Sequence, residues 1–356
     1  GQTNFATNAG TAGADLNVDT AIVSGITGSG VVVAVLDSGL ELNHEDLADN
    51  IVSGSYDFEN SDNDPTTSTN DGDHGTSVAG IIASKGWNNK GGRGVAPNAS
   101  LIGYNWLAIT NNTVANVQKM WGVNPPIAVD VDVFNMSLGS GYGKDENEDP
   151  NTTYTFAEII SSAMEAGLIN GTDNLRSGKG ATYIKSSGNS FKDQATSDCS
   201  SNLSCTSLII DDKHASPFIT VVGALDADNI KTTYSSTGAG LWVSGFGGES
   251  GFNSSIVSGY ATGTDKPAIM TVDQSGCSQG YVSEAGKIKT YGSNISPNPF
   301  NVHETPNSEN TNCNYTSTFN GTSSAAPTVS GVVALMLQAN PDLTWRDVKH
   351  ILARTS

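Results

Sequence analysis

One stretch, VVVAVLD at residues 31–37, restricts the possible folds more than any other. It is a continuous apolar run that ends in one acid, which is typical of a parallel strand buried on both faces. Similar strand patterns follow at residues 99–106, 131–137, 181–189 and 218–225. Helical patterns alternate with them at residues 74–84, 154–167 and 325–340. This alternation predicts an α/β fold with a mostly parallel sheet and helices on both faces.

The chain has 356 residues, and we expect residues 1–356 to form a single domain around one core. Two segments rich in Ser, Asn and Gly, near residues 191–212 and 277–318, interrupt the alternation and are interpreted as surface insertions. The chain starts without a secretion leader, and no strand follows its last helical pattern at residues 341–356. We therefore expect it to be trimmed at both ends.

The four cysteines allow three pairings, of which the local choice is Cys199 with Cys205 and Cys277 with Cys313. Their even number in an acidic chain favours an oxidising compartment, and four free thiols in a cytosolic enzyme are the alternative.

The charge and the hydropathy of the chain exclude some partners. A formal net charge of -19 argues against nucleic acid, because the phosphates would be repelled, and it suits cationic peptides or metal ions. The longest apolar runs, VVVAVL and VVALML, are far shorter than the roughly 18 residues that a membrane span needs. We expect a soluble protein that contacts neither nucleic acid nor membrane.

Four residues supply the parts that nucleophilic acyl transfer requires: a hydroxyl, a base, an acid that orients the base, and a donor for the oxyanion. Asp37 ends the first strand pattern, His74 opens a helical pattern, Asn189 ends another strand pattern, and Ser323 precedes a helical pattern. Taken singly, a strand-end Asp often forms a turn, and a Ser before a helix often caps it. The order Asp, His, Ser is the order found in subtilisin.

With these residues in place, the sequence resembles the subtilisin-like serine proteases over almost its whole length, and within them the kexin and proprotein-convertase branch. The resemblance is carried by the motifs DLNVDTAIVSGITGSGVVVAVLDSGLELNHEDLADN, DHGTSVAGIIAS, GVNPPIAVDVDVFNMSLG, SSGN, NGTSSAAP and ANPDLTWRDVKHIL. It implies a subtilisin-like three-layer sandwich and a secreted, extracellular bacterial serine endopeptidase made as a zymogen. It also implies that a β-rich P-type domain follows in the full protein.

The resemblance assigns a role to each of the four residues. Ser323 would attack the scissile carbonyl, His74 would accept the proton of Ser323, and Asp37 would hold the imidazole. The Asn189 amide and the backbone N–H of Ser323 would bind the oxyanion. Ser324 would be a packing neighbour. The alternatives are a broad-specificity subtilisin and a secreted binding module without activity, although a binding module would not need all four residues.

By the same resemblance, the segment Ser137, Leu138 and Gly139 would pair with the main chain of the substrate. Asp211, or Asp212 beside it, would select Arg or Lys in the first specificity pocket, and Asp71 would contribute to the second. Ser38 stands where kexins carry another acid, and a further pocket acid is replaced near Tyr142. We therefore expect a preference for Arg or Lys at the first position and a relaxed second position.

The resemblance further implies a structural Ca²⁺ in the glycine-rich loop at residues 84–94. The expected ligands are the side chains of Asp46 and Asn88 and the backbone carbonyls of Lys85, Lys90 and Gly92, a set of oxygen donors that suits calcium. Ser236 stands where convertases have a Glu, so a second calcium site is expected to be lost.

Cys277 has a counterpart in convertases, but the position of that counterpart's partner is Gly91 here. This leads to the hypothesis of a Cys277–Cys313 pair. The expected partners are protein or peptide substrates and a propeptide or chaperone, and the expected state is a monomer.

Overall fold

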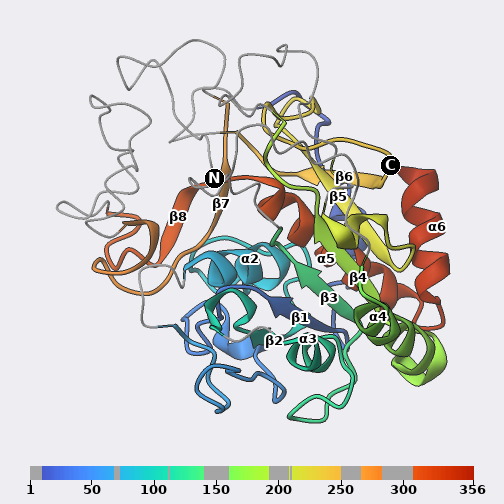
Figure 1. The fold of residues 1–356 in the computed structure, drawn as a ribbon. Helices are drawn as coiled ribbons and strands as arrows, with labels where there is room; N and C mark the ends of the chain where they lie inside the picture. Colours follow the sequence, from blue (N-terminus) through green and yellow to red (C-terminus); the bar gives the residue numbers. More distant parts are fainter. Residues whose placement is uncertain are drawn as a thin grey trace, which may run out of the picture.

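A computed structural model describes residues 10–67, 73–110, 113–139, 160–191, 208, 211–249, 266–282 and 308–356. Its centre is a six-stranded sheet in the order β2-β1-β3-β4-β5-β6, and every neighbouring pair is parallel (Figure 1). The strands are β1 (Val32–Leu36), β2 (Ser100–Tyr104), β3 (Val133–Met136), β4 (Thr182–Ser186), β5 (Ile219–Leu225) and β6 (Leu241–Phe246). The predicted α/β fold with a parallel sheet is confirmed.

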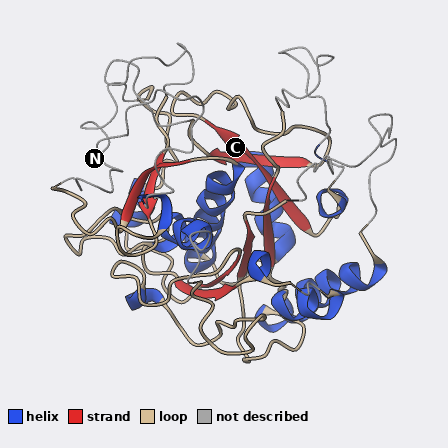
Figure 2. Cartoon of the chain, turned by 60° about the vertical axis from the view of Figure 1, so that its left-hand side comes forward, coloured by secondary structure: helices blue, strands red, loops and turns tan. Residues whose placement is uncertain are grey.

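Helices cover both faces of this sheet (Figure 2). α2 (Asp73–Ala83) and α5 (Thr322–Ala339) contribute to one apolar core, and α3 (Val114–Met120) and α4 (Ser162–Asn174) contribute to the other. α6 (Trp345–Thr355) contacts β6, and α1 (Asp19–Val23) precedes β1. Short 3₁₀ helices lie at Ala48–Asn50, Trp106–Ala108, Arg176–Gly178, Asp212–Ala215 and Gly280–Val282.

Strand β1 explains why the first apolar run has no polar interruption. Val33 and Val35 point into the core that contains α2 and α5, whereas Ala34 and Leu36 point into the core that contains α3 and α4. Successive residues of a strand face opposite sides, so a strand buried between two layers must be apolar throughout. The run ends at Asp37, which is also buried and directly follows the carboxyl end of β1.

Some elements differ from the sequence prediction. α4 begins at Ser162 because the Ser161 side chain accepts a hydrogen bond from the Met164 backbone N–H at 3.2 Å and caps the helix; residues 154–159 of the predicted helix lie outside the described residues. β4 ends at Ser186, which leaves residues 187–189 in a loop. α3, β6 and the antiparallel pair β7 (Ile269–Val272) and β8 (Tyr315–Phe319) were not predicted.

The disulfide Cys277–Cys313 is confirmed, with an S–S distance of 2.02 Å. It joins the segment after β7 to the segment before β8. Cys199, Cys205 and most of the two predicted insertions lie outside the described residues. In the part of the chain that the structure describes, no helix is both long and apolar enough to cross a membrane.

Candidate active site

His74 at the start of α2 contacts Asp37 at the end of β1. His74 Nδ1 lies 2.6 Å from Asp37 Oδ1, the same oxygen that accepts a 2.7 Å hydrogen bond from the Ser38 backbone N–H. The Asp37 side chain is 0% exposed and the His74 side chain is 27% exposed. The carboxylate thus orients one side of an imidazole that solvent can still reach, which is the arrangement that a general base requires.

Gly75 allows this close approach of α2 to the turn after β1. A Cβ atom at Gly75 would lie 2.0 Å from the carbonyl oxygen of Gly39 and 2.9 Å from the Asp37 Cβ. The Gly75 backbone N–H donates to Ser38 Oγ at 3.1 Å, which ties the first turn of the helix to the strand end. A larger residue at this position would separate His74 from Asp37.

Ser323 is the second residue of α5, and it contacts the segment that follows β3. The Ser323 hydroxyl donates to the Ser137 carbonyl at 3.3 Å, and the Ser137 hydroxyl donates to the Ser323 carbonyl at 2.9 Å. Ser323 is partly exposed, whereas Ser324 is 0% exposed and its Oγ has no hydrogen-bond partner among the described residues. Of the two serines, only Ser323 is accessible to a substrate.

Asn189 and the start of α5 lie next to each other around Gly321. Asn189 Oδ1 accepts hydrogen bonds from the backbone N–H and the hydroxyl of Thr322, both at 2.9 Å. A Cβ atom at Gly321 would lie 3.2 Å from Asn189 Nδ2 and 3.5 Å from the backbone nitrogen of Ser323. The Asn189 amide nitrogen and the Ser323 backbone nitrogen therefore both lie close to Gly321, where no side chain separates them, and such a pair of donors can stabilise an oxyanion. Gly321 and Thr322 were not predicted as site residues, although both stand inside the NGTSSAAP motif.

The expected substrate segment lies beside the expected pocket acid. Ser137 and Leu138 are buried and Gly139 is exposed, and a Cβ atom at Gly139 would lie 3.8 Å from Asp211 Oδ2. Asp211 is itself buried, and its Oδ2 lies 2.9 Å from the ammonium group of Lys185. Lys185 was not predicted as a site residue. Asp71 and Tyr142 lie outside the described residues.

The loop expected to hold calcium contains part of the expected ligand set. Asp46 Oδ1 accepts a 2.6 Å hydrogen bond from Asn88 Nδ2, and the Lys85 backbone N–H donates to the Asp46 carbonyl at 2.9 Å. Asp46 is 1% exposed, and its Oδ2 has no hydrogen-bond partner among the described residues. Burial raises the pKa of Asp46 to about 6. A buried carboxylate oxygen that lacks a partner fits a cation ligand, because a cation would compensate for the lost hydration.

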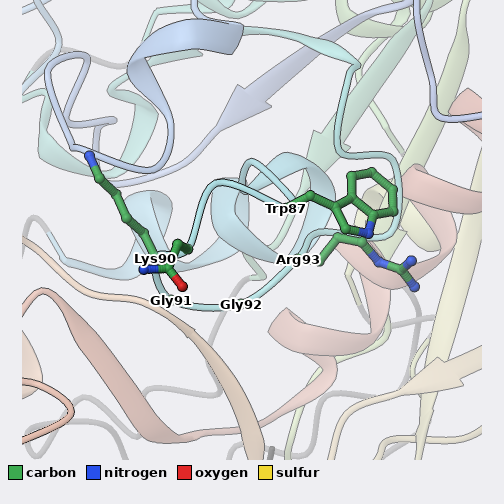
Figure 3. A pocket seen from close by; sticks show the side chains of 6 residues that line it. Trp87, Lys90, Gly91, Gly92 and Arg93 are labelled. Atoms are coloured by element: carbon green, nitrogen blue, oxygen red, sulfur yellow. The ribbon is translucent and has the colours of Figure 1, made fainter.

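Lys90 and Gly92 lie in the same loop, around a hollow of about 540 Å³ that Figure 3 shows. The Arg93 guanidinium lies 5.4 Å from the centre of the Trp87 ring, and Lys90 Nζ lies 3.5 Å from Glu45 Oε2. Within the described ranges, no group of three or more His, Cys, Asp or Glu side chains could hold a metal ion. Any metal in this loop would therefore depend on backbone carbonyls as well as on Asp46 and Asn88.

This geometry agrees with a family comparison. The family model described as "Subtilase family" matches residues 28–356. The chain belongs to the subtilase family. The family expected from the motifs is thereby confirmed, and this subtilase carries Asp37, His74, Asn189 and Ser323 inside the matched range.

Relatives of this subtilase include an extracellular bacterial serine protease and kexin. The extracellular serine protease of Aeromonas sobria is 34% identical over 369 residues, which cover 100% of this chain and 53% of that protein. Kexin of Saccharomyces cerevisiae is 29% identical over 345 residues, which cover 95% of this chain and 32% of that protein. The chain thus spans about half the length of the Aeromonas protease and about a third of kexin.

Solved structures show the same fold. The serine protease of Aeromonas sobria in complex with the chaperone ORF2 matches with a TM-score of 0.80 at 32% identity, covering 99% of this chain and 54% of that chain. A cold-adapted subtilisin-like serine proteinase, 21% identical, matches with a TM-score of 0.55 over 92% of this chain and 82% of that chain. The first structure supports family and fold, and the second supports the fold alone.

Proposed function

We propose that this subtilase is a serine endopeptidase that hydrolyses peptide bonds through an acyl-enzyme, with Ser323 as nucleophile. The observation that carries the proposal is the contact between His74 Nδ1 and Asp37 Oδ1 at 2.6 Å, in a chain whose Ser323 backbone nitrogen and Asn189 Nδ2 both lie close to Gly321. Ser323 Oγ attacks the scissile carbonyl, and His74 accepts the hydroxyl proton and then donates it to the leaving amine. The buried Asp37 carboxylate stabilises the imidazolium that forms in between.

The negative charge that develops on the carbonyl oxygen has defined partners in this proposal. Asn189 Nδ2 and the Ser323 backbone N–H donate to the oxyanion, and the start of α5 adds the positive end of the helix dipole. Thr322 donates two hydrogen bonds to the side-chain oxygen Oδ1 of Asn189, so the side-chain amide is oriented before the substrate arrives. This preorganisation favours the transition state over the ground state.

The expected pocket is compatible with two substrate specificities, a preference for basic residues and broad specificity. A preference for Arg or Lys at the first position rests on Asp211, a relaxed second position rests on Asp71 and Ser38, and both remain predictions. Broad specificity is favoured by one observation. Asp211 is 6% exposed and its carboxylate is already paired with the Lys185 ammonium at 2.9 Å, so it has less to offer a basic substrate side chain. The exposed Gly139 and its neighbours Ser137 and Leu138 would hold the substrate main chain, whatever the side chains are.

We further propose that Ca²⁺ stabilises the loop at residues 84–94. Asp46, Asn88 and the carbonyls of Lys85, Lys90 and Gly92 would hold the ion, which would neutralise the buried Asp46 carboxylate. The bound ion would supply folding stability and take no part in peptide hydrolysis.

The similarity to the extracellular Aeromonas sobria protease, whose complex with a chaperone has been solved, supports two proposals for this chain. We propose that it is secreted and acts outside the cell as a monomer, and that a propeptide or chaperone assists its folding. Immunoblotting of culture supernatant and cell pellet tests secretion, and retention of the protein in the pellet would contradict it.

The proposed reaction is tested by hydrolysis of casein and by rapid mixing with p-nitrophenyl acetate. An acyl-enzyme predicts an initial burst of p-nitrophenol close to the enzyme concentration, absent from Ser323→Ala. A folded protein that shows neither a burst nor casein hydrolysis would support the binding-module alternative.

A further inference from the structure

Lys185 is a fully buried lysine at the end of the sheet that carries Asp37 and Asn189. It lies in β4 near its carboxyl end, and its side chain is 0% exposed. Its ammonium group donates to the Leu138 carbonyl at 2.7 Å and lies 2.9 Å from Asp211 Oδ2. Buried lysines are rare unless they are paired, so this ammonium has a specific reason to be there.

The Lys185–Asp211 pair lies directly behind the segment that the proposed mechanism uses to hold the substrate. Leu138, whose carbonyl accepts from Lys185, stands between Ser137, which contacts the Ser323 hydroxyl, and the exposed Gly139. A Cβ atom at Gly139 would lie 3.8 Å from Asp211 Oδ2 and equally 3.8 Å from Lys185 Nζ. The ammonium and the carboxylate are therefore equally close to the exposed Gly139, beside which the proposed mechanism places the substrate.

The charged side chains around Asp211 form two ion pairs whose charges cancel. Lys185 pairs with Asp211, and Lys213 pairs with Asp212 at 2.5 Å. Burial alone would raise the pKa of Asp211, but Lys185 and Lys213 hold the pKa below its usual range, so the carboxylate is ionised. His214, 3.0 Å from Lys185 Nζ, is held uncharged because burial lowers its pKa to about 4. Burial lowers the pKa of Lys185, and the Asp211 carboxylate beside it opposes that shift. With both members of each ion pair charged, the group carries no net charge.

We propose that Lys185 is a specificity-determining residue that neutralises Asp211 and thereby makes the first substrate position accept uncharged side chains about as readily as Arg or Lys. The inference rests on the proposed endopeptidase function. An Arg or Lys side chain of a substrate gains little from a carboxylate that already has an internal cation beside it. An uncharged side chain loses nothing there, because it needs no counter-ion.

The wild-type protein provides the first test. A series of fluorogenic peptides that differ only at the first position, with Arg, Lys, Leu, Phe or Gln, gives kcat/KM for each. We expect the Arg peptide to lie within about tenfold of the Leu peptide, because an already paired carboxylate offers little selectivity. A preference for Arg over Leu of about a hundredfold or more would overturn the inference.

The second test is Lys185→Met, which removes the charge and keeps much of the length of the side chain. The unpaired Asp211 should then raise the Arg-to-Leu ratio of kcat/KM at pH 8 by about tenfold or more. The double variant Lys185→Met/Asp211→Asn should return the ratio to the wild-type value. Lys179→Met is a matched control, since Lys179 precedes β4 at its other end and pairs with Asp342 at the surface.

The outcomes separate the two proposals. A purely structural Lys185 predicts that Lys185→Met lowers kcat/KM equally for all peptides, and this result would overturn the inference while leaving the endopeptidase intact. A wild-type protein that cleaves none of the peptides would instead contradict the proposed function. If Lys185→Met does not fold, the wild-type series alone decides.

Discussion

Asn189 Oδ1 accepts two hydrogen bonds from Thr322, one from its backbone N–H and one from its hydroxyl, both at 2.9 Å. These bonds connect the loop after β4 to the first residue of α5, far apart in sequence. They also fix which end of the amide is turned away from Thr322. The Asn189 side-chain nitrogen therefore lies near Gly321, 3.2 Å from the position that a Cβ atom would take there.

Replacement of Asn189 by Ala should lower kcat by about 10²- to 10³-fold with little change in KM, the loss that accompanies removal of such a donor from subtilisin. The reason is that the donor acts on the oxyanion, which exists only in the transition state. Steady-state kinetics on a single peptide measure the effect. An unchanged kcat would remove Asn189 from the mechanism.

Gly321→Ala should lower kcat because its Cβ atom would enter the space between Asn189 Nδ2 and the Ser323 backbone N–H. The backbone φ of Gly321 is +101°, so the substitution also introduces strain. Gly276→Ala is a matched control, since Gly276 has φ +97° and no atom within 4 Å of a Cβ placed on it.

Both glycine variants should lose similar stability in urea unfolding, because the strain is similar. Only Gly321→Ala should lose about tenfold or more in kcat, the order expected for disturbing one oxyanion donor. Equal kinetic losses in both variants would assign the effect to strain.

The parallel sheet was predictable because strands buried on both faces are continuously apolar, as in β1. The rule that chemistry lies at the carboxyl ends of such strands also led to Asp37 and Asn189. β6 was missed because its burial alternates and Trp242 is 42% exposed, and β8 was missed because its sequence YTSTF is largely polar.

Lys185 could not be assigned from sequence for a different reason. A lone lysine in the strand pattern ATYIKSSGN is indistinguishable from one that faces solvent. Only the packing of β4 against the segment at Leu138 and against Asp211 shows that its ammonium is buried and paired.

His214 should make the protein less stable in acid. Burial lowers its pKa from 6.5 to about 4, so between these values the unfolded chain binds a proton that the folded chain does not. The free energy of unfolding is therefore unaffected by His214 above pH 6.5 and falls as the pH drops from 6.5 towards 4, by up to about 3 kcal/mol.

Urea unfolding at a series of pH values measures this slope. His214→Gln should flatten it between pH 6.5 and 4, whereas His350→Gln, at an exposed position of α6, should not. The same slope in wild type and His214→Gln would show that other groups cause the acid sensitivity.

Removal of calcium should destabilise the protein through the loop at residues 84–94. EDTA should lower the melting temperature of the wild type by about 5 °C, because an ion that binds only the folded state stabilises it by mass action. Asp46→Asn should abolish this response, and Asp49→Asn, at an exposed neighbouring position, should retain it. A melting temperature that EDTA leaves unaltered in the wild type would exclude a tightly linked calcium.

The central claim, that Ser323 is a nucleophile activated by His74, is tested most directly by covalent labelling with diisopropyl fluorophosphate and mass spectrometry of the peptides. We expect one adduct, on Ser323, in the wild type and in Ser324→Ala, since Ser324 is buried and inaccessible. His74→Ala should give no adduct, because the hydroxyl then lacks its base. A folded wild-type protein that remains unlabelled, or that is labelled on Ser324, would contradict the account.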